Sequence, residues 1–413
     1  MKDLIIGYIN DSHELEKLYR SNKSLFKREF NMLYPEIEGS TFANFWNERL
    51  NYESDEINWA TGRELLFMLT GAFFAGVIAK LPAFLNIDQE FFYTRNACFI
   101  IFPVLAAYFA WKNKLSTGKI TFVVLSALTG LLFINWLPGA KKSDTLFLSC
   151  IHMAIFLWSL LGFAFVGNQD NTEKRLGYLR YNGDLLVMTT LIVIAAGILS
   201  GVTVGLFSLI GINIENFYFE NIVIFGLPAA PIFATFLIKT NPQLVGKVSP
   251  VIAKIFSPLV LAMLLIYLTA IVYTGKDPYN DREFLMVFNV LLIGVMAIIF
   301  FSIAETFRAT LSRLEKWTLP LLSVMTLIVN GIALSAILFR ISEWGITPNR
   351  AAVLGGNVLI IINLLLVTIQ LFRMLFKKGD ISAVEKVIIR YLPVYFVWAI
   401  IVIFLFPFLF GFK

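Results

Sequence analysis

Apolar runs of roughly 20 residues, each long enough to cross a bilayer as a helix, recur along the chain after residue 64. Short polar segments separate them, and the runs lack the alternating pattern of roughly ten residues that is typical of membrane barrel strands. The pattern predicts an all-α, polytopic membrane protein with about eleven transmembrane helices. We expect them near residues 65–85, 97–111, 120–138, 146–166, 185–211, 221–238, 251–273, 284–304, 319–339, 351–372 and 392–411.

Residues 1–64 are polar by comparison and form a second region, distinct from the membrane bundle of 65–413. Apolar residues at helical spacing predict a small helical module, and they include Leu15, Leu18, Tyr19, Phe26, Phe30, Leu33, Tyr34, Phe42, Phe45, Trp46 and Leu50. About 60 residues are marginal for an independent core. We therefore expect these faces to pack on the membrane domain or on a cytoplasmic protein partner.

Composition and charge fix the environment and the orientation. The chain is 58% hydrophobic and 15% charged, whereas soluble domains carry about a quarter charged residues. Residues 1–64 hold eight Lys+Arg against twelve Asp+Glu, so the module is acidic. A cytoplasmic N-terminus places 25 Lys+Arg inside and 9 outside. The positive-inside rule then predicts a cytoplasmic N-terminus and an outer C-terminus. Aromatic residues at span ends fit an interfacial belt, namely Trp59, Trp111, Trp136, Trp317, Trp344 and Tyr391.

Prolines concentrate in the sixth and seventh predicted spans. Gly226, Pro228 and Pro231 lie in the sixth span and Pro258 in the seventh. Proline removes a backbone donor and clashes with the preceding turn, so we expect the sixth span to kink or break there and to expose backbone groups at a functional centre. Lys254 lies one turn into the seventh span. It either extends to the inner interface or faces the broken helix and an anionic substrate.

The segment from Arg340 to Arg350 predicts a tight helical hairpin at the outer face. Gly345 can end the ninth span in the left-handed conformation, and Thr347 can cap the tenth, with Pro348 at its first position. The positive helix end and the two arginines would suit a phosphate or carboxylate, such as a lipid headgroup.

Two structural alternatives for the same hairpin remain open. Glu343, one turn beyond Arg340, can neutralise that arginine and make the segment a clamp. Arg340, Trp344 and Arg350 can also serve only to anchor the hairpin at the membrane interface.

Other chemistry has little support in the sequence. It contains no phosphate loop, no H-E-x-x-H, no G-x-S-x-G and no dinucleotide fingerprint. We expect no cofactor, no nucleic-acid partner and no disulfide framework, because Cys98 and Cys150 lie inside apolar segments. Asp184 and Glu305 lie at cytoplasmic span ends, which disfavours a proton pump. His152 is interpreted as a core residue.

An enzyme acting on lipid-linked sugars would need an acidic pair in the first outer loop to bind a metal. Asp88 and Glu90 have that form. The short outer loops leave little protein to shape an outward-facing catalytic cavity, so this is the weaker interpretation.

The later spans resemble an uncharacterised bacterial family, domain of unknown function 4153. The resemblance rests on the runs Val251–Pro278 and Leu319–Arg350. Within them it is carried by the Pro258-Leu259 pair and by Arg340, Gly345, Ile346, Thr347, Asn349 and Arg350. It implies a polytopic protein of the bacterial cytoplasmic (inner) membrane, without an assigned activity.

Three functions stay open at this point. We favour transport or translocation of a small solute or lipid, because spans one to five and six to ten would be related as an inverted repeat, a common carrier plan. In the first span the counterparts of the prolines would be Gly71 and Gly76. A scaffold or sensor would bind a cytoplasmic partner through residues 1–64 and lipid through interfacial stretches at 306–318 and 381–391. A lipid-linked envelope-glycan enzyme is the third.

The orientation can be tested with reporters fused after Lys413. We expect a reporter that is active only outside the cytoplasm to be active there, because the 25-to-9 charge asymmetry places the C-terminus outside. The same reporter fused after residue 242 should be silent. Activity of a cytoplasm-only reporter after Lys413 would contradict the predicted topology.

Overall fold

The computed structural model describes residues 2–9, 11–21, 23–51, 62–139, 143–168, 172–209, 212–242, 248–274, 279, 282–306, 313–376 and 380–413. All regular structure in these residues is helical, as the apolar pattern predicted. The chain divides into two compact units, Met1–Asn58 and Trp59–Lys413.

The first unit has a core of its own. It contains α1 (Lys2–Gly7), α2 (Ser12–Ser21), α3 (Lys23–Ile37) and α4 (Thr41–Asn51). Their apolar faces meet in one cluster of Ile5, Leu15, Phe26, Phe30, Leu33, Ala43, Trp46 and Leu50. Most of these faces therefore close on one another within the unit, whereas Phe42 and Phe45 are exposed, and a partner for them stays a prediction. Large aromatic side chains compensate for the short chain, because each buries much apolar area; the rings of Phe26 and Trp46 lie 5.2 Å apart.

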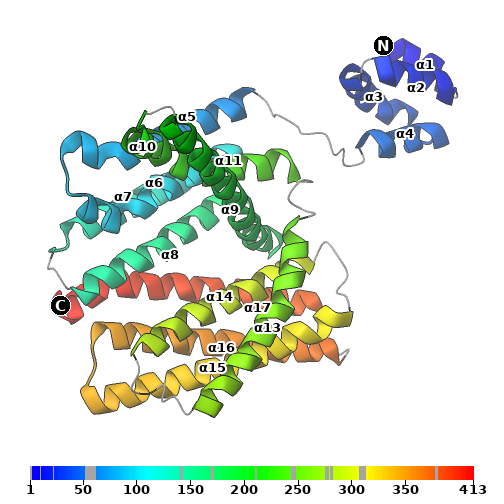
Figure 1. Cartoon of the computed structure of the whole chain (residues 1–413). Coiled ribbons are helices and arrows are strands. Elements are labelled where there is room, and N and C mark those ends of the chain that lie inside the picture. The colour runs from blue at the N-terminus through cyan, green and yellow to red at the C-terminus, as the bar shows by residue number, and fades with distance from the viewer. Residues whose placement is uncertain are drawn as a thin grey trace. The chain divides into compact units, whose positions relative to one another are not determined.

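The second unit is a bundle of long apolar helices (Figure 1). They are α5 (Gly62–Leu85), α6 (Gln89–Lys112), α7 (Thr117–Trp136), α8 (Asp144–Val166), α9 (Thr172–Leu209), α10 (Glu215–Tyr218), the π-helical turn η1 (Phe219–Val223), α11 (Ile224–Thr240), α13 (Val248–Thr274), α14 (Arg282–Thr306), α15 (Arg313–Trp344), α16 (Pro348–Leu375), α17 (Ile381–Ile400), the π-helical turn η2 (Ile401–Leu405) and α18 (Phe406–Leu409).

Within the described residues, nine helices are long and apolar enough to cross a membrane. Two shorter apolar stretches, Phe256–Ile266 and Phe288–Ala304, lie within α13 and α14. Each of the eleven predicted spans coincides with a helix. The multi-pass helical architecture is thus supported, while the count of eleven crossings stays a prediction.

The order in which helices pack is similar in the two halves of the bundle. In the first half α6 packs on α7 and α8, α7 packs on α8, and α8 packs on α9. In the second half α13 packs on α14 and α15, α14 packs on α15, and α15 packs on α16. The first helices of the two halves, α5 and α11, pack against each other. Gly76 of α5 makes this approach close, because a side chain there would overlap the ring of Phe225.

The proline-rich span does not break. α11 is helical through Gly226, Pro228 and Pro231, and α13 is helical through Pro258. The predicted break is therefore absent from α11, and the alternative of a kink stays a prediction. In a bilayer the backbone has no water to bond with, so a helix keeps its form around a proline where neighbours satisfy the freed groups.

Side chains from neighbouring helices cap the C-terminal ends of several helices. The guanidinium of Arg95, on α6, donates to the carbonyls of Ile134 and Leu137 at the end of α7, at 2.6 and 2.9 Å. Arg180 of α9 donates to the Ala304 carbonyl near the end of α14. Carbonyls that have no partner within their own helix are thereby satisfied.

The end of α8 is held in the same way from two sides. Asn113 donates to the carbonyls of Ala164 and Phe165 at 3.0 and 2.8 Å, and Lys119 donates to the Gly167 carbonyl at 2.8 Å. Both donors lie in the connection from α6 to α7 and the start of α7. These hydrogen bonds hold the end of α8 against the end of α6 and the start of α7.

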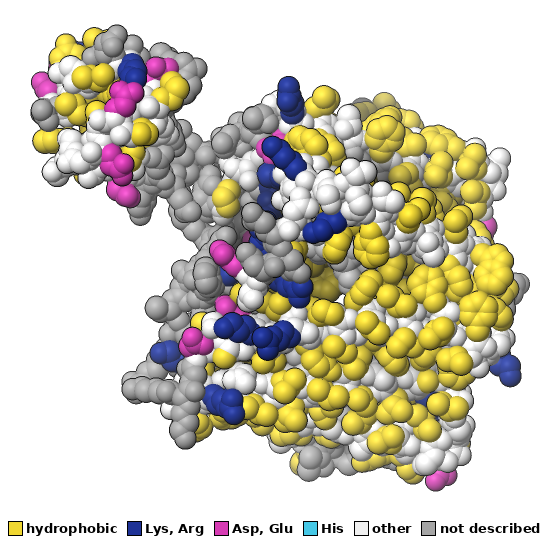
Figure 2. All heavy atoms as spheres, turned by 180° about the vertical axis from the view of Figure 1, so that it is seen from behind, with side chains coloured by type: hydrophobic (Ala, Val, Ile, Leu, Met, Phe, Trp, Pro, Cys, Tyr) yellow, Lys and Arg dark blue, Asp and Glu magenta, His cyan; other side chains and the backbone are white. Residues whose placement is uncertain are grey.

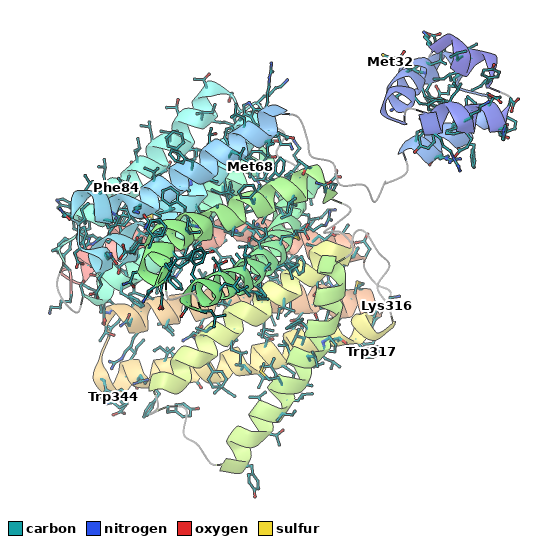
Figure 3. All side chains as sticks on the ribbon, turned by 45° about the horizontal axis from the view of Figure 1, so that its top comes forward. Met32, Met68, Phe84, Lys316, Trp317 and Trp344 are labelled. Atoms are coloured by element: carbon teal, nitrogen blue, oxygen red, sulfur yellow. The ribbon has the colours of Figure 1, made fainter. Side chains whose placement is uncertain are left out.

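The surface of the bundle has an apolar belt. Figure 2 shows broad hydrophobic sides and a concentration of Lys and Arg side chains at one end. Figure 3 shows Trp317 and Trp344 at opposite ends of α15, and both rings are exposed. The sequence interpretation associated a charged end with the cytoplasmic face and tryptophans at helix ends with the two membrane interfaces. Which end of the bundle faces the cytoplasm stays a prediction.

The segment 381–391 does not lie on the surface as an interfacial helix. It is the first half of α17 and continues into the last apolar helix, Ile381–Leu409. Val384 and Ile388 are fully buried in the largest core cluster. The sequence showed an apolar face correctly, but the bundle, not the lipid surface, covers it. Of the other predicted interfacial stretch, residues 307–312 lie outside the described residues.

Glu16 supplies the charged link within the first unit. Its carboxylate accepts from Arg20 at 2.8 Å and lies 2.8 Å from Arg49. The hydrogen bond from Arg20, aided by the charge of Arg49, holds the pKa of Glu16 below its ordinary value of 4.5, although partial burial opposes the shift. Because the folded unit favours the charged carboxylate, this stabilisation is complete above pH 4.5 and declines as the pH falls through the lowered pKa.

We expect Glu16→Gln to lower the melting temperature of a 1–58 fragment at neutral pH. Partly exposed ion pairs contribute about 1 kcal/mol, which corresponds to roughly 4–8 °C for a domain this small. Circular dichroism at neutral pH and at about pH 3 measures the effect. The difference should shrink at the lower pH, and Glu38→Gln, which changes an exposed glutamate, is the control. Equal melting of Glu16→Gln and wild type at neutral pH would contradict the role of Glu16.

Candidate functional site

Three asparagines are buried within the apolar helices α15 and α16. Asn330 and Asn363 are 0% exposed and Asn357 is 2% exposed. The Asn330 amide donates to the Asn357 backbone carbonyl at 3.2 Å. The Asn363 amide donates to the Tyr395 hydroxyl, on α17, at 2.9 Å. We call Asn330, Asn357, Asn363 and Tyr395 the amide track. Asn357 and Asn363 are six positions apart on one helix, so the track covers about 9 Å of helix length.

One amide atom of each asparagine has no hydrogen-bond partner in the structure. These atoms are the acceptors Asn330 Oδ1 and Asn363 Oδ1 and the donor Asn357 Nδ2. Leaving a buried polar atom without a partner costs about 1–3 kcal/mol. Natural proteins rarely tolerate this without a bound molecule or a functional reason.

Nearby hydroxyl groups do not supply the missing partners. Ser323, Thr326 and Thr368 are buried on the same two helices, and each donates to a carbonyl of its own helix, at 2.8, 2.6 and 2.6 Å. The Tyr395 hydroxyl, besides accepting from Asn363, donates to Met296 Sδ on α14 at 3.4 Å. The amide track is thus a group of buried polar side chains that includes three atoms without a hydrogen-bond partner. Apolar side chains of α14 to α17 surround it.

The Arg340–Arg350 hairpin has the predicted backbone geometry. Gly345 has φ +73° and ends α15. The Thr347 side chain accepts from the Arg350 backbone N–H at 3.3 Å, with Pro348 opening α16. Both arginines lie near one ring: the guanidinium carbons of Arg340 and Arg350 are 5.3 and 5.6 Å from the centre of Trp344.

Arg350 is also a structural donor in this hairpin. Its guanidinium donates to the carbonyls of Trp344 and Gly345 at 2.8 and 2.6 Å, closing the end of α15. Glu343 is exposed. The hairpin therefore combines a clamp through Arg350 with a second guanidinium, that of Arg340, beside the same ring. Whether it binds an anion stays a prediction.

The other predicted residues do not join this site. The side chain of Lys254 lies outside the described residues. Asp88 caps α6, accepting from the Phe91 N–H at 2.7 Å, and Glu90 is exposed in its first turn. Among the described residues no group of three or more His, Cys, Asp or Glu is arranged to hold a metal. His152 Nδ1 lies 2.8 Å from the Leu148 carbonyl oxygen of its own helix.

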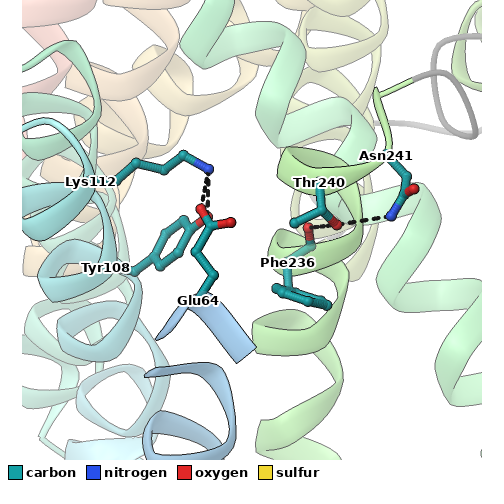
Figure 4. A network of polar contacts seen from close by, with 6 residues as sticks. All are labelled: Glu64, Tyr108, Lys112, Phe236, Thr240 and Asn241. Carbon is teal, nitrogen blue, oxygen red and sulfur yellow. Dashed lines mark hydrogen bonds and ion pairs between the residues drawn. The ribbon is translucent and has the colours of Figure 1, made fainter. Parts of the chain in front are cut away.

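Figure 4 shows two separate groups of polar contacts at helix ends. Lys112 Nζ, at the end of α6, donates to Glu64 Oε1 of α5 at 2.6 Å and to the Tyr108 hydroxyl at 3.1 Å. Just after α11, the Asn241 amide donates to the Thr240 hydroxyl at 2.9 Å. The first group joins two helices and the second lies at the end of one, so we interpret both as structural.

Lys239, on the same turn of α11, lies among aromatic rings. Its Nζ is 4.3 Å from the centre of the Phe165 ring and 5.2 and 5.3 Å from those of Phe109 and Tyr181. Ring faces attract a cation in this geometry. The lysine thereby anchors the end of α11 to α6, α8 and α9.

The amide track escaped the sequence interpretation because that interpretation looked for charged groups and prolines inside the spans. A signal was present: Asn330, Asn357 and Asn363 interrupt strongly apolar runs. Polar residues within membrane helices are functional candidates by default. The sequence could not show that all three point into the bundle.

Comparison of the chain with protein-family models, with curated proteins and with solved structures finds no match.

The hairpin gives a prediction about anionic lipid. We expect Arg340→Gln to weaken binding of phosphatidylglycerol, measured by native mass spectrometry of the purified protein, because it removes one of the two guanidiniums beside Trp344. Arg350→Gln should weaken binding and also lower stability by about 1–3 kcal/mol, because two carbonyls lose their donor.

Lys413→Gln removes one charge at residue 413 and is the control for a general charge effect. If Arg340→Gln and Lys413→Gln reduce lipid binding equally, the hairpin has no specific anion site and acts only as a clamp.

Proposed function

We propose that this protein is a carrier that moves a small polar solute across the bacterial inner membrane, with the amide track as its solute site. The proposal rests on the three amide atoms of Asn330, Asn357 and Asn363 that have no hydrogen-bond partner, although each of these side chains is at most 2% exposed. An apolar residue at each position would fold with less penalty. Retaining amides there makes sense if they bind something.

The chemistry of the track favours a neutral or zwitterionic solute. It offers two acceptors and one donor, and the described residues of the track carry no charge. A polyol, a carboxamide or the polar part of an amino acid can pair with such a set. Several weak hydrogen bonds in a water-poor site orient a solute without holding it so tightly that it is not released.

The arrangement of helices supports a carrier. The neighbour order of α6 to α9 recurs in α13 to α16, and the first helices of the halves, α5 and α11, pack together. An inverted repeat with paired first helices is a common carrier plan, in which one half moves against the other. The unbroken α5 and α11 differ from that plan, in which discontinuous helices hold the substrate.

A scaffold function is the second candidate, favoured by the surface of the first unit. Met32, Phe42 and Phe45 are exposed although the unit has a complete core. Exposed apolar side chains of this size are typical of protein interaction sites. The proposal is that the acidic module binds a cytoplasmic protein partner, and it is compatible with transport by the bundle.

We expect a thermal-shift screen of purified protein against polyols, carboxamides and zwitterionic amino acids to find a stabilising solute. Asn330→Leu should abolish that shift. Its own melting temperature should stay close to wild type, because the substitution removes one hydrogen bond but also one oxygen without a partner. Ser335→Ala, which changes an exposed residue of the same helix, should behave as wild type.

The solute found in this way should enter vesicles containing wild-type protein faster than vesicles containing Asn330→Leu. A stabilising solute whose effect survives Asn330→Leu would place its site elsewhere. Binding without uptake would argue for a sensor.

A further inference from the structure

A buried carboxylate lies at the start of α17. Glu385 is 3% exposed, and its Oε1 has no hydrogen-bond partner in the structure. The sequence interpretation placed this residue in an interfacial stretch, where a glutamate would face water. Its neighbours Val384 and Ile388 are fully buried in the largest core cluster instead.

Two charged groups act on Glu385 across space. They are Arg180, on α9, and Asp380, which caps α17. α8, α14 and α16 also pack against α17, and among the described residues they bring no further charged group that acts on this carboxylate. Asp184, the other buried carboxylate, lies one turn after Arg180 on α9.

Two opposing effects act on this carboxylate. Removal from water disfavours the charge, and the guanidinium of Arg180 favours it. Arg180 is itself held in place, because it donates to the Ala304 carbonyl of α14. Adding or removing a proton on Glu385 therefore changes its interaction with Arg180 and with the packed helices around it.

A metal cation is a poorer occupant of the same position. A monovalent or divalent cation needs several oxygen ligands, whereas among the described residues no three or more His, Cys, Asp or Glu are arranged to hold a metal. The positive charge of Arg180 would also repel a metal cation. A proton needs only the one open oxygen that Glu385 offers.

We propose that Glu385 is a proton-binding site and that proton binding there drives the carrier. The proton adds to Oε1 to give the neutral acid and leaves from the same oxygen, and no other bond changes. α17 carries both Glu385 and Tyr395 of the amide track, ten residues or about 15 Å apart along the helix. A shift of α17 on protonation would therefore reach the track. The coupling part of this inference rests on the proposed carrier function; the proton site does not.

Infrared difference spectroscopy of the full-length protein in lipid nanodiscs, titrated with acid and base and without any solute, tests the site. We expect a protonated-carboxyl band from a group in an apolar setting to appear and vanish with pH in wild type. Glu385→Gln should remove this band completely. Glu173→Gln, at an exposed glutamate of α9, should leave it unchanged.

Two further variants keep the result decisive. Glu385→Asp keeps a carboxyl group and should keep the band at a shifted position, which covers the case in which Glu385→Gln does not fold. Asp184→Asn should keep the band. The proposal would be overturned if the band persisted in Glu385→Gln. It would also be overturned if the band disappeared in Asp184→Asn while the Glu385 variants kept it.

Coupling is measured separately from proton binding. Vesicles with a pH-sensitive dye inside should acidify when the stabilising solute is added to wild type, and should not acidify with Glu385→Gln. If no solute moves at all but the band titrates, the carrier function fails and the proton site stands. If solute moves without protons in wild type, the coupling is wrong and the carrier stands.

Discussion

Helix ends in a membrane leave backbone carbonyls that neither the helix nor the lipid can satisfy, and the bundle is built around meeting that need. Arg95 closes α7, Asn113 and Lys119 close α8, Arg180 bonds near the end of α14, and Arg350 closes α15. In every case the donor belongs to another helix or to the loop beside it. Each bond thus ends one helix and fixes its position against a neighbour.

This constraint changes the meaning of the charges. The sequence presents arginines and lysines near span ends as a topology signal, and the structure gives several of them a second role as backbone donors. Arg350 combines both roles, since it lies at a span end and bonds two carbonyls of the preceding helix. A guanidinium used in this way is a weaker candidate for ligand binding than Arg340, which lies beside the same Trp344 ring.

While these helix-end carbonyls have hydrogen-bond donors, a few buried side-chain atoms have no hydrogen-bond partner. The open atoms of Asn330, Asn357 and Asn363 and the open Oε1 of Glu385 lie among tightly packed apolar side chains of α14 to α17. The first half of the bundle pairs its buried amides, as Asn96 and Asn135 do by bonding each other at 3.0 and 2.8 Å. The buried polar atoms without a hydrogen-bond partner therefore lie mostly in the second half of the bundle, where the solute and proton sites are proposed.

The sequence alone determined the helical membrane class, the approximate position of each long helix and the backbone of the Gly345–Thr347 hairpin, because these depend on local hydrophobicity and on local capping geometry. It also identified the apolar faces around Phe26 and Val384. It could not determine what covers those faces: the face around Phe26 closes largely on its own unit, and the face around Val384, predicted to be interfacial, enters the bundle. The break at Pro228 and Pro231 was wrong for a related reason, since packing against α5 and the absence of competing water keep the helix intact. Only the tertiary structure could show which polar side chains are paired, because pairing depends on the rotation of each helix relative to its neighbours, which helical periodicity does not encode.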